Sequence, residues 1–159
     1  MNRRIVVLDV REILKAKGEP FEKIMAAVGE LTEDDVLELH ATFRPDPLLK
    51  VLGKQGFAHS VVKEEEEHFI VQFYKEATSI PFFHLDNRGL EPPQPMVRTL
   101  TFLDAHNECS EGELGLEIWN ERVPAFLLPE LEERGFSFEP DDEGNGTVRV
   151  RIFRQKDEG

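Results

Sequence analysis

Leu8-Asp9-Val10-Arg11, near the start of the chain, returns 77 residues later as Leu85-Asp86-Asn87-Arg88. Three further matches follow in the same order: Glu19-Pro20 with Gln94-Pro95, Leu48-Leu49 with Leu127-Leu128, and Gly56-Phe57 with Gly135-Phe136. The offset changes from 77 to 75 and then to 79 residues, which is typical of a duplication followed by small loop insertions. The chain is therefore expected to contain one small domain twice.

The first copy alternates between strand and helix patterns. Arg4 to Leu8 is an apolar run of strand length, and a polar loop leads to Pro20, which suits the first turn of a helix. That helix is expected to continue to about Leu31, because its apolar residues are spaced to form one buried stripe. The remaining expected elements are a strand at 36–41, a helix at 45–54, and a hairpin of strands at 58–62 and 68–74.

The second copy repeats this order. Strands are expected at 82–85, 114–119, 137–139 and 148–154, and helices at 95–106 and 123–134. In the second of these helices, Phe126, Leu127, Leu128 and Leu131 are expected to face the core. Each copy therefore reads βαβαββ, which predicts an α+β protein made of two tandem two-layer sandwiches. The sheet face away from the helices must then be either exposed to solvent or covered by a neighbouring domain or protein.

The domains are expected to cover residues 1–76 and 82–157, with a short linker at 76–81. A domain of about 75 residues buries little apolar surface, so we expect the two copies to pack on each other. Limited proteolysis in the linker that released two halves without affinity for each other would contradict this packing.

Composition narrows the class of partner. The 159-residue chain has a net charge of −13, which argues against binding to nucleic acid or anionic membranes and favours basic or cationic partners. Its single cysteine, Cys109, cannot form an intramolecular disulfide, so a cytoplasmic location is expected. The apolar run after Arg4 is too short for a signal peptide or a membrane span.

The run LDNRGLEPPQP at residues 85–95 resembles the L-D-x-R-G-L-x-C-P-x-P signature of the TusA (SirA-like) sulfur-carrier family. Pro93 and Pro95 match the signature, but Pro92 stands where that family has its sulfur-accepting cysteine. The first copy keeps the L-D-x-R start and Pro20, but an extra residue shifts the loop, and Lys17 lies nearest the cysteine position. The chain is most similar to an uncharacterised group of TusA-related domains that lacks the thiol.

In the carriers that the chain resembles, the cysteine sits at a helix N-terminus, where the helix dipole and free N–H groups stabilise a thiolate. Proline and lysine cannot replace this chemistry. The resemblance implies a fold and no established activity. The leading hypothesis is a cytoplasmic, non-catalytic module that binds a protein partner or a small ligand and needs no cofactor. A sulfur-relay accessory protein and an anion- or metal-sensing protein remain alternatives.

Basic residues beside the first strand of each copy form a candidate anion site. Arg11 and Arg88 follow these strands and, with N–H groups near Pro20 and Pro95, would hold a small anion. Lys15 and Lys17 add positive charge in the first copy only. The favoured alternative is structural, with the loop fixed by ion pairs: Asp9 with Arg11, and Asp86 with Arg88.

Other reactive side chains give weaker signals. Cys109 is expected in an acidic loop, where nearby carboxylates raise a thiol's pKa, and His106 precedes it by three residues. Two ligands fall short of a zinc site, so no metal site is predicted. His40, His59, His68 and His84 lie in or beside expected strands, and we interpret them as structural or surface residues. No catalytic residue is predicted, because no known catalytic spacing occurs in the sequence.

Overall fold

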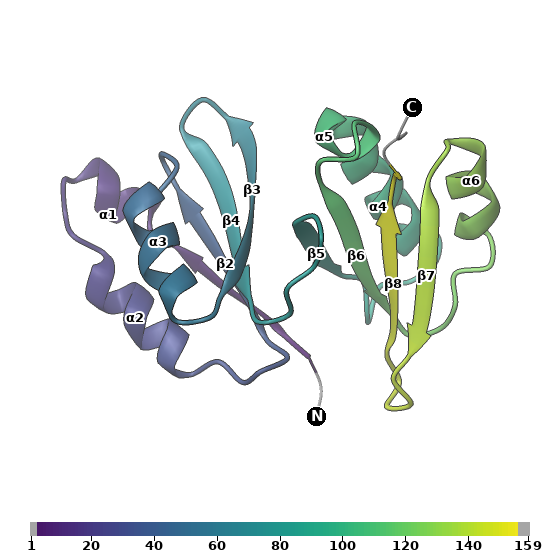
Figure 1. Cartoon of the computed structure of the whole chain (residues 1–159), viewed down its shortest axis with the longest axis horizontal. Coiled ribbons are helices and arrows are strands. Elements are labelled where there is room, and N and C mark those ends of the chain that lie inside the picture. The colour runs from purple at the N-terminus through teal and green to yellow at the C-terminus, as the bar shows by residue number, and fades with distance from the viewer. Residues whose placement is uncertain (1–2, 156–159) are drawn as a thin grey trace. The chain divides into compact units, whose positions relative to one another are not determined.

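The computed structural model describes residues 3–155, which form two α+β domains (Figure 1). The chain divides between Ser79 and Ile80. The predicted inner boundaries at residues 76 and 82 lie on either side of this point. The predicted outer boundaries, residues 1 and 157, lie outside the described residues.

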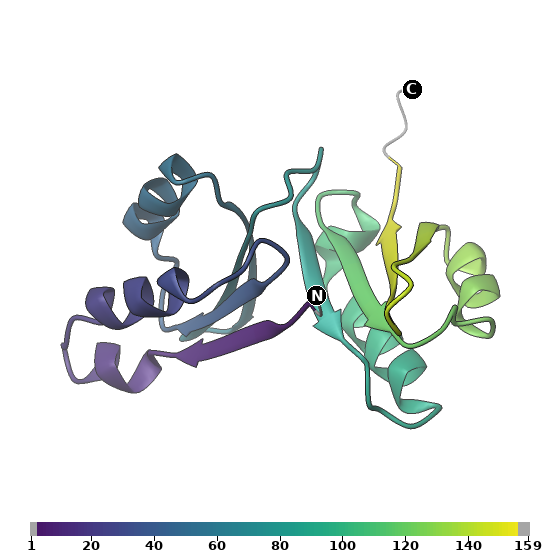
Figure 2. The same cartoon turned by 90° about the horizontal axis from the view of Figure 1, so that it is seen from below.

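The first domain follows the predicted βαβαββ order with one short helix added. Its elements are β1 (Ile5–Asp9), α1 (Arg11–Lys15), α2 (Phe21–Gly29), β2 (Val36–Ala41), α3 (Asp46–Lys54), β3 (Ala58–Glu65) and β4 (His68–Tyr74). The strands lie in the order β1-β2-β4-β3, with β1 parallel to β2 and the other pairs antiparallel. Figure 2 shows the helices of this domain together on one side of its sheet.

The second domain has the same topology. Its elements are β5 (Phe82–Asp86), α4 (Gln94–Ala105), α5 (Asn107–Ser110), β6 (Gly115–Asn120), α6 (Leu127–Glu133), β7 (Ser137–Asp142) and β8 (Val148–Phe153). The strand order is β5-β6-β8-β7, and again only the first pair is parallel. The prediction of two repeated α+β sandwiches is confirmed.

Alternation along β2 separates a core face from a polar face in the first domain. Leu37, Leu39 and Ala41 are at most 1% exposed and belong to the same apolar core as residues of α2 and α3. Successive side chains of a strand point to opposite faces, so Glu38 and His40 lie on the face away from the helices. The first sheet thus has one face that carries the core and one face that carries polar side chains.

The repeat extends to the turns that end α3 and α6. Gly56 and Gly135 have positive φ angles of 93° and 83°, which a residue without Cβ adopts at little cost. The amide of Phe57 donates to the carbonyl of Leu52, and that of Phe136 to the carbonyl of Leu131, at 3.0 and 2.9 Å. The Gly-Phe pairs that revealed the duplication therefore close the same turn in both copies.

Three local predictions were wrong. Part of the expected polar loop before Pro20 is helix α1, because Ile13 and Leu14 pack partly buried against the core. Helix α6 begins at Leu127, later than predicted, and Phe126 is 88% exposed and does not face the core. Cys109 lies in the short helix α5, where it is buried, and not in an open acidic loop.

Candidate functional site

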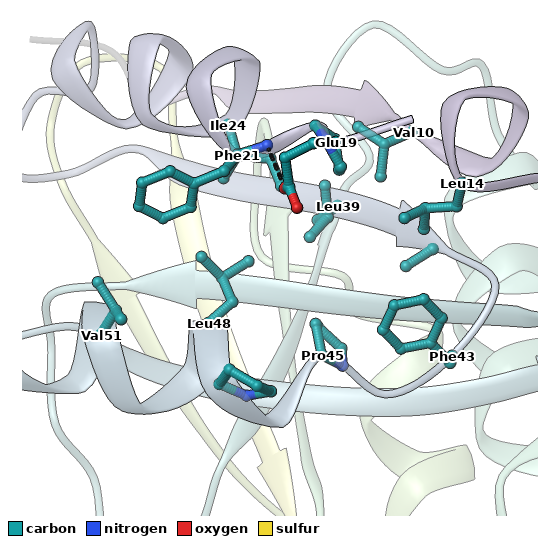
Figure 3. Close-up of a pocket in the computed structure, with 13 residues that line it drawn as sticks. Val10, Leu14, Glu19, Phe21, Ile24, Leu39, Phe43, Pro45, Leu48 and Val51 are labelled. Carbon is teal, nitrogen blue, oxygen red and sulfur yellow. Dashed lines mark hydrogen bonds between the residues drawn. The ribbon is translucent and has the colours of Figure 1, made fainter. Parts of the chain in front are cut away.

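A pocket of about 460 Å³ opens in the first domain between α2 and α3. Figure 3 shows Phe21 and Ile24 of α2 on one side and Leu48 and Val51 of α3 on the other. Leu39 of β2 lies between them. Ile24, Leu39 and Leu48 are buried, whereas Phe21 and Val51 are 43% and 38% exposed. The apolar floor is therefore formed by core residues, and the rim is formed by side chains that water reaches.

Prolines make the helix ends that border this pocket poor in hydrogen-bond donors. Pro20 is the N-cap residue of α2, Pro45 is that of α3, and Pro47 lies in the first turn of α3. Proline has no N–H group to offer to an anion. The amide of Phe21 already donates to Glu19 Oε1 at 2.9 Å, and that of Asp46 donates to the carbonyl of Arg44. These two helix starts thus resemble an apolar wall more than an anion site.

Glu19 is the one charged side chain among the described residues that line the pocket. It lies just before α2, and one carboxylate oxygen accepts the hydrogen bond from Phe21. Figure 3 shows this carboxylate beside the open space of the pocket. The site therefore combines a large apolar surface with a single negative charge.

The second domain places polar side chains at the corresponding positions. The amide of Val10 donates to the carbonyl of His40, and the amide of Asn87 donates to that of Trp119, so Val10 and Asn87 are equivalent. Asn87 Nδ2 donates to Thr99 Oγ1 at 3.3 Å and to Asn120 Oδ1 at 3.2 Å, and all three residues are buried. The two copies have therefore diverged at the floor of this pocket.

The sheet face away from the helices carries a hydrogen-bonded chain in the first domain. His40 Nδ1 lies 2.8 Å from His68 Nε2, and His40 Nε2 lies 2.9 Å from Glu38 Oε2. Gln72 donates to the other oxygen of Glu38 at 2.9 Å. The chain joins β2 to β4, which are neighbouring antiparallel strands. His40 and His68 are two of the four histidines that were predicted to be structural or surface residues. Both take part in hydrogen bonds of this sheet.

An ionic network occupies the same face of the second sheet. Glu117, equivalent to Glu38, accepts hydrogen bonds from Trp119 Nε1 at 2.7 Å, Arg149 Nη2 at 2.9 Å and Arg151 Nε at 3.0 Å. Burial alone would raise the pKa of Glu117, but the nearby charges of His84 and Arg149, together with the hydrogen bonds from Arg149 and Trp119, lower it to about 2. Trp119 stands at the position of His40. The equivalent glutamates therefore accept a hydrogen bond from an imidazole in the first copy and from an indole in the second.

The arginines of the predicted anion site are both engaged with carboxylates. Arg11 donates to both oxygens of Asp9, at 3.0 Å from Nε and 2.7 Å from Nη2, which lowers the pKa of Asp9. Arg88 donates to Asp86 Oδ1 at 2.9 Å and to Thr147 Oγ1 at 2.9 Å. The ion pairs expected as the structural alternative are present. Anion binding at these residues stays a hypothesis beside this structural role.

Lys15 and Lys17, the remaining residues of that predicted site, are exposed, and the prolines of the second copy's motif lie at the start of α4. Lys15 is the last residue of α1, and Lys17 follows in a turn with a φ of 61°. Pro92 is exposed in the loop before α4, Pro93 is the N-cap residue of that helix, and Pro95 is in its first turn. Pro95, the residue at which this helix was expected to begin, therefore lies in its first turn.

Cys109 and His106 do not form a reactive pair. Cys109 is 1% exposed, and burial, together with the charge of Glu108, raises the pKa of its thiol to about 12. His106 is also buried, and its Nδ1 lies 2.8 Å from the carbonyl oxygen of Phe102. Within residues 3–155, no three His, Cys, Asp or Glu side chains are arranged to hold a metal ion.

Sequence reasoning missed the pocket, the His40–His68 pair and the Glu117 network. The paired Leu-Glu at 37–38 and 116–117 was a usable signal for the two networks, because a repeated acid inside a buried strand needs partners. The pocket left no such signal in the sequence.

Across the described part of the chain, no helix has the length and apolar character needed to cross a membrane.

Comparison with protein families agrees with the duplication. A family model described as an uncharacterized conserved protein (DUF2249) matches the chain twice, over residues 7–75 and 84–154. Neither the curated proteins nor the solved structures gave a match to this chain. The two matched segments cover most of both domains.

Proposed function

Since this chain belongs to the DUF2249 family, which is described only as uncharacterized, we propose a function from its geometry. The protein is a non-catalytic binding protein, and its first domain takes up a small, mainly apolar molecule in the pocket between α2 and α3. The observation that carries this proposal is the 460 Å³ pocket itself, whose floor is formed by buried core residues. Concave, largely apolar cavities of this size are typical of small-molecule sites.

The chemistry of the walls supports an apolar ligand over an anion. Pro20, Pro45 and Pro47 remove N–H groups from the two helix starts, and the amides of Phe21 and Asp46 are already bonded. An anionic head group would therefore find few donors in this pocket. Apolar surface that is removed from water contributes roughly 25 cal/mol per Å², which is the expected source of affinity.

The resemblance to TusA-like carriers supports binding without sulfur transfer. The thiol of those proteins is replaced by Pro92 in the second domain, and Lys17 lies nearest its position in the first. The single cysteine, Cys109, is buried, and its raised pKa disfavours a nucleophilic thiolate. A chain with one such cysteine also suits a reducing compartment, so we place the protein in the cytoplasm.

The proposal also assigns different roles to the two domains. The buried side chain of Asn87 donates to Thr99 and Asn120 where the first domain presents an apolar floor. The second domain would not offer an equivalent apolar site, and the ligand-to-protein ratio should be one.

A neutral fluorescent probe tests the site directly. N-Phenyl-1-naphthylamine, whose emission increases in apolar surroundings, should bind the full chain with a saturable signal. Val51→Trp, at the rim, should weaken binding by about ten-fold or more, equivalent to about 1.4 kcal/mol, because the indole fills the opening. Val97→Trp is the matched control, because Val97 is a similarly exposed helical valine in the second domain.

Either of two results would contradict the proposal. One is the absence of saturable binding to the unmodified chain. The other is equal binding by the Val51→Trp and Val97→Trp proteins, which would place the probe on some other apolar surface. Circular dichroism of both variants verifies that the substitutions leave the fold intact.

A further inference from the structure

The charge of Glu19 limits which apolar molecules the pocket accepts. We propose that the ligand carries a cationic amine, which pairs with the Glu19 carboxylate while its apolar part lies between α2 and α3. This inference rests on the proposed function, because it names the chemical class of the molecule bound at that same pocket.

The position of the carboxylate provides the geometric basis. Glu19 Oε1 accepts the N–H of Phe21 at 2.9 Å, which holds the side chain at the start of α2. A carboxylate has two oxygens and about four lone-pair sites, so this bond leaves acceptor capacity unused. Figure 3 shows the carboxylate beside the space between Leu39 and Leu48. A donor group on a bound ligand would meet it there.

Desolvation gives the energetic reason. Glu19 is an exposed residue, so a ligand that fills the pocket removes part of the water around its carboxylate, and the part lost without a replacement partner is penalised. A purely apolar ligand would incur this cost. An ammonium group would offset it with a charge-assisted hydrogen bond, which is stronger than a neutral one.

Binding of a ligand with a carboxylate or phosphate head would be disfavoured for two reasons. Its charge would repel Glu19, and the nearby prolines Pro20, Pro45 and Pro47 provide no N–H groups to receive it. The net charge of −13 also attracts cations to the whole molecule. A test must therefore separate the local charge of Glu19 from this general attraction.

Three molecules with the same chain and different heads provide the test: octylamine, 1-octanol and octanoate. Calorimetric titration of the full chain at neutral pH should rank octylamine first and octanoate last, with about ten-fold or more between them. Glu19→Gln should remove this preference while retaining an oxygen that can accept the Phe21 N–H. Glu22→Gln is the matched control, because Glu22 is likewise an exposed glutamate, in the first turn of α2, but does not line the pocket. The control should keep the preference.

The outcomes separate the two proposals. Equal binding of all three molecules, lost in Val51→Trp, would overturn the amine preference and leave the proposed function standing. A preference for octylamine that persists in Glu19→Gln would also overturn it, because the selectivity would then come from the overall charge. If none of the molecules bound, or if Val51→Trp had no effect on them, the proposed function itself would fail.

Discussion

His40 Nδ1 and His68 Nε2 lie 2.8 Å apart across the neighbouring strands β2 and β4. A direct contact between two ring nitrogens requires a lone pair on one of them, so the two facing atoms cannot both carry a proton. On its other side, His40 is fixed by Glu38. The chain Glu38–His40–His68 therefore favours a state in which at least one ring is neutral.

This pair predicts a pH dependence of stability. Burial, followed by the charges of Arg11 and His40, lowers the pKa of His68, while Glu64 and Asp9 act in the opposite direction. A lowered pKa means that the folded state binds the proton less well than the unfolded chain does. The stabilising contribution is therefore complete above the ordinary value of 6.5 and is lost progressively as the pH falls below it.

Urea denaturation at about pH 7.5 and about pH 5.5 measures this effect, because the range spans histidine titration. The unmodified chain should lose more stability on acidification than His68→Asn. The pKa of His59 is lowered in the same direction by burial and Arg44, so His59 contributes equally to both proteins. An identical loss in the two proteins would show that His68 is not the titrating group.

Glu117 should be much more sensitive to substitution than its counterpart Glu38. Glu117→Gln leaves the buried Arg149 without its closest carboxylate, and we expect a loss of about 3–5 kcal/mol, as when other buried ion pairs are broken. Glu38→Gln should cost less, because the side chains of His40 and Gln72 that contact Glu38 are an imidazole and an amide, and not a buried guanidinium. Fluorescence of Trp119, the only tryptophan in the chain, reports the unfolding of this domain during urea titration.

The same carboxylate predicts resistance to mild acid in the second domain. The folded pKa of Glu117 is about 2, against an ordinary value of 4.5. Its contribution to stability is therefore fully present above pH 4.5 and is lost as the pH falls toward 2. Trp119 fluorescence in urea at successively lower pH should show this decline in the unmodified chain but not in Glu117→Gln.

Cys109 should be inert in the folded protein. The thiol is 1% exposed and has a pKa raised to about 12, mainly by burial, so little thiolate is present or accessible. We expect Ellman's reagent to react only as fast as the domain unfolds, and rapidly once guanidinium is added. Mass spectrometry after incubation with thiosulfate should find no persulfide. A persulfide formed quickly on Cys109 would instead favour the sulfur-relay alternative.

Arg88→Ala should destabilise the protein more than Arg11→Ala. Arg88 bonds Asp86 and Thr147, and its guanidinium lies 5.2 Å from the ring centre of Trp119. Its loss should cost about 1.5–3 kcal/mol, as for other hydrogen bonds to charged groups. The Asp9–Arg11 pair is closer to the surface, where ion pairs contribute little. Thermal unfolding of the two variants provides the comparison.

The same two variants test the predicted anion site. Both guanidinium groups are already paired, so phosphate and sulfate should leave the unfolding midpoint of the unmodified chain unchanged. A rise in the midpoint that disappears in Arg88→Ala would establish anion binding at this loop.

The sequence predicted the architecture well because the signals were local. The strands expected at 36–41 and 148–154 correspond to β2 and β8, the repeated Gly-Phe pairs lie in the turns after α3 and α6, and the repeated L-D-x-R lies where β1 and β5 end. Helices α1 and α5 were missed because five and four residues are too few for a helical period to be recognised. Phe126 was expected to face the core because it is apolar. It instead lies just before α6, in a turn where the amide of Leu127 donates to the carbonyl of Pro124.

The sites were harder to predict, because they depend on residues that come together only in the folded chain. Glu38 meets Gln72 across 34 residues, and the pocket exists only because α2 and α3 leave space between them. The equivalence of His40 and Trp119 was visible in the sequence. Their hydrogen-bond acceptors, Glu38 and Glu117, stand two residues earlier and were not recognised. A charged residue in the middle of a buried strand was the available clue.

Both copies keep a glutamate in this strand, but the ring that bonds it is a histidine in one copy and a tryptophan in the other. This pattern can be used to search other sequences. Leu37-Glu38-Leu39-His40 and Leu116-Glu117-Ile118-Trp119 stand 29 and 31 residues after the Asp of their L-D-x-R motifs, measured from Asp to Glu. A search profile that joins L-D-x-R to a downstream L-E-x-His/Trp would not require any match in the variable loop between them. It should find copies whose loop has diverged beyond recognition, and sort them by the aromatic ring that each pairs with its glutamate.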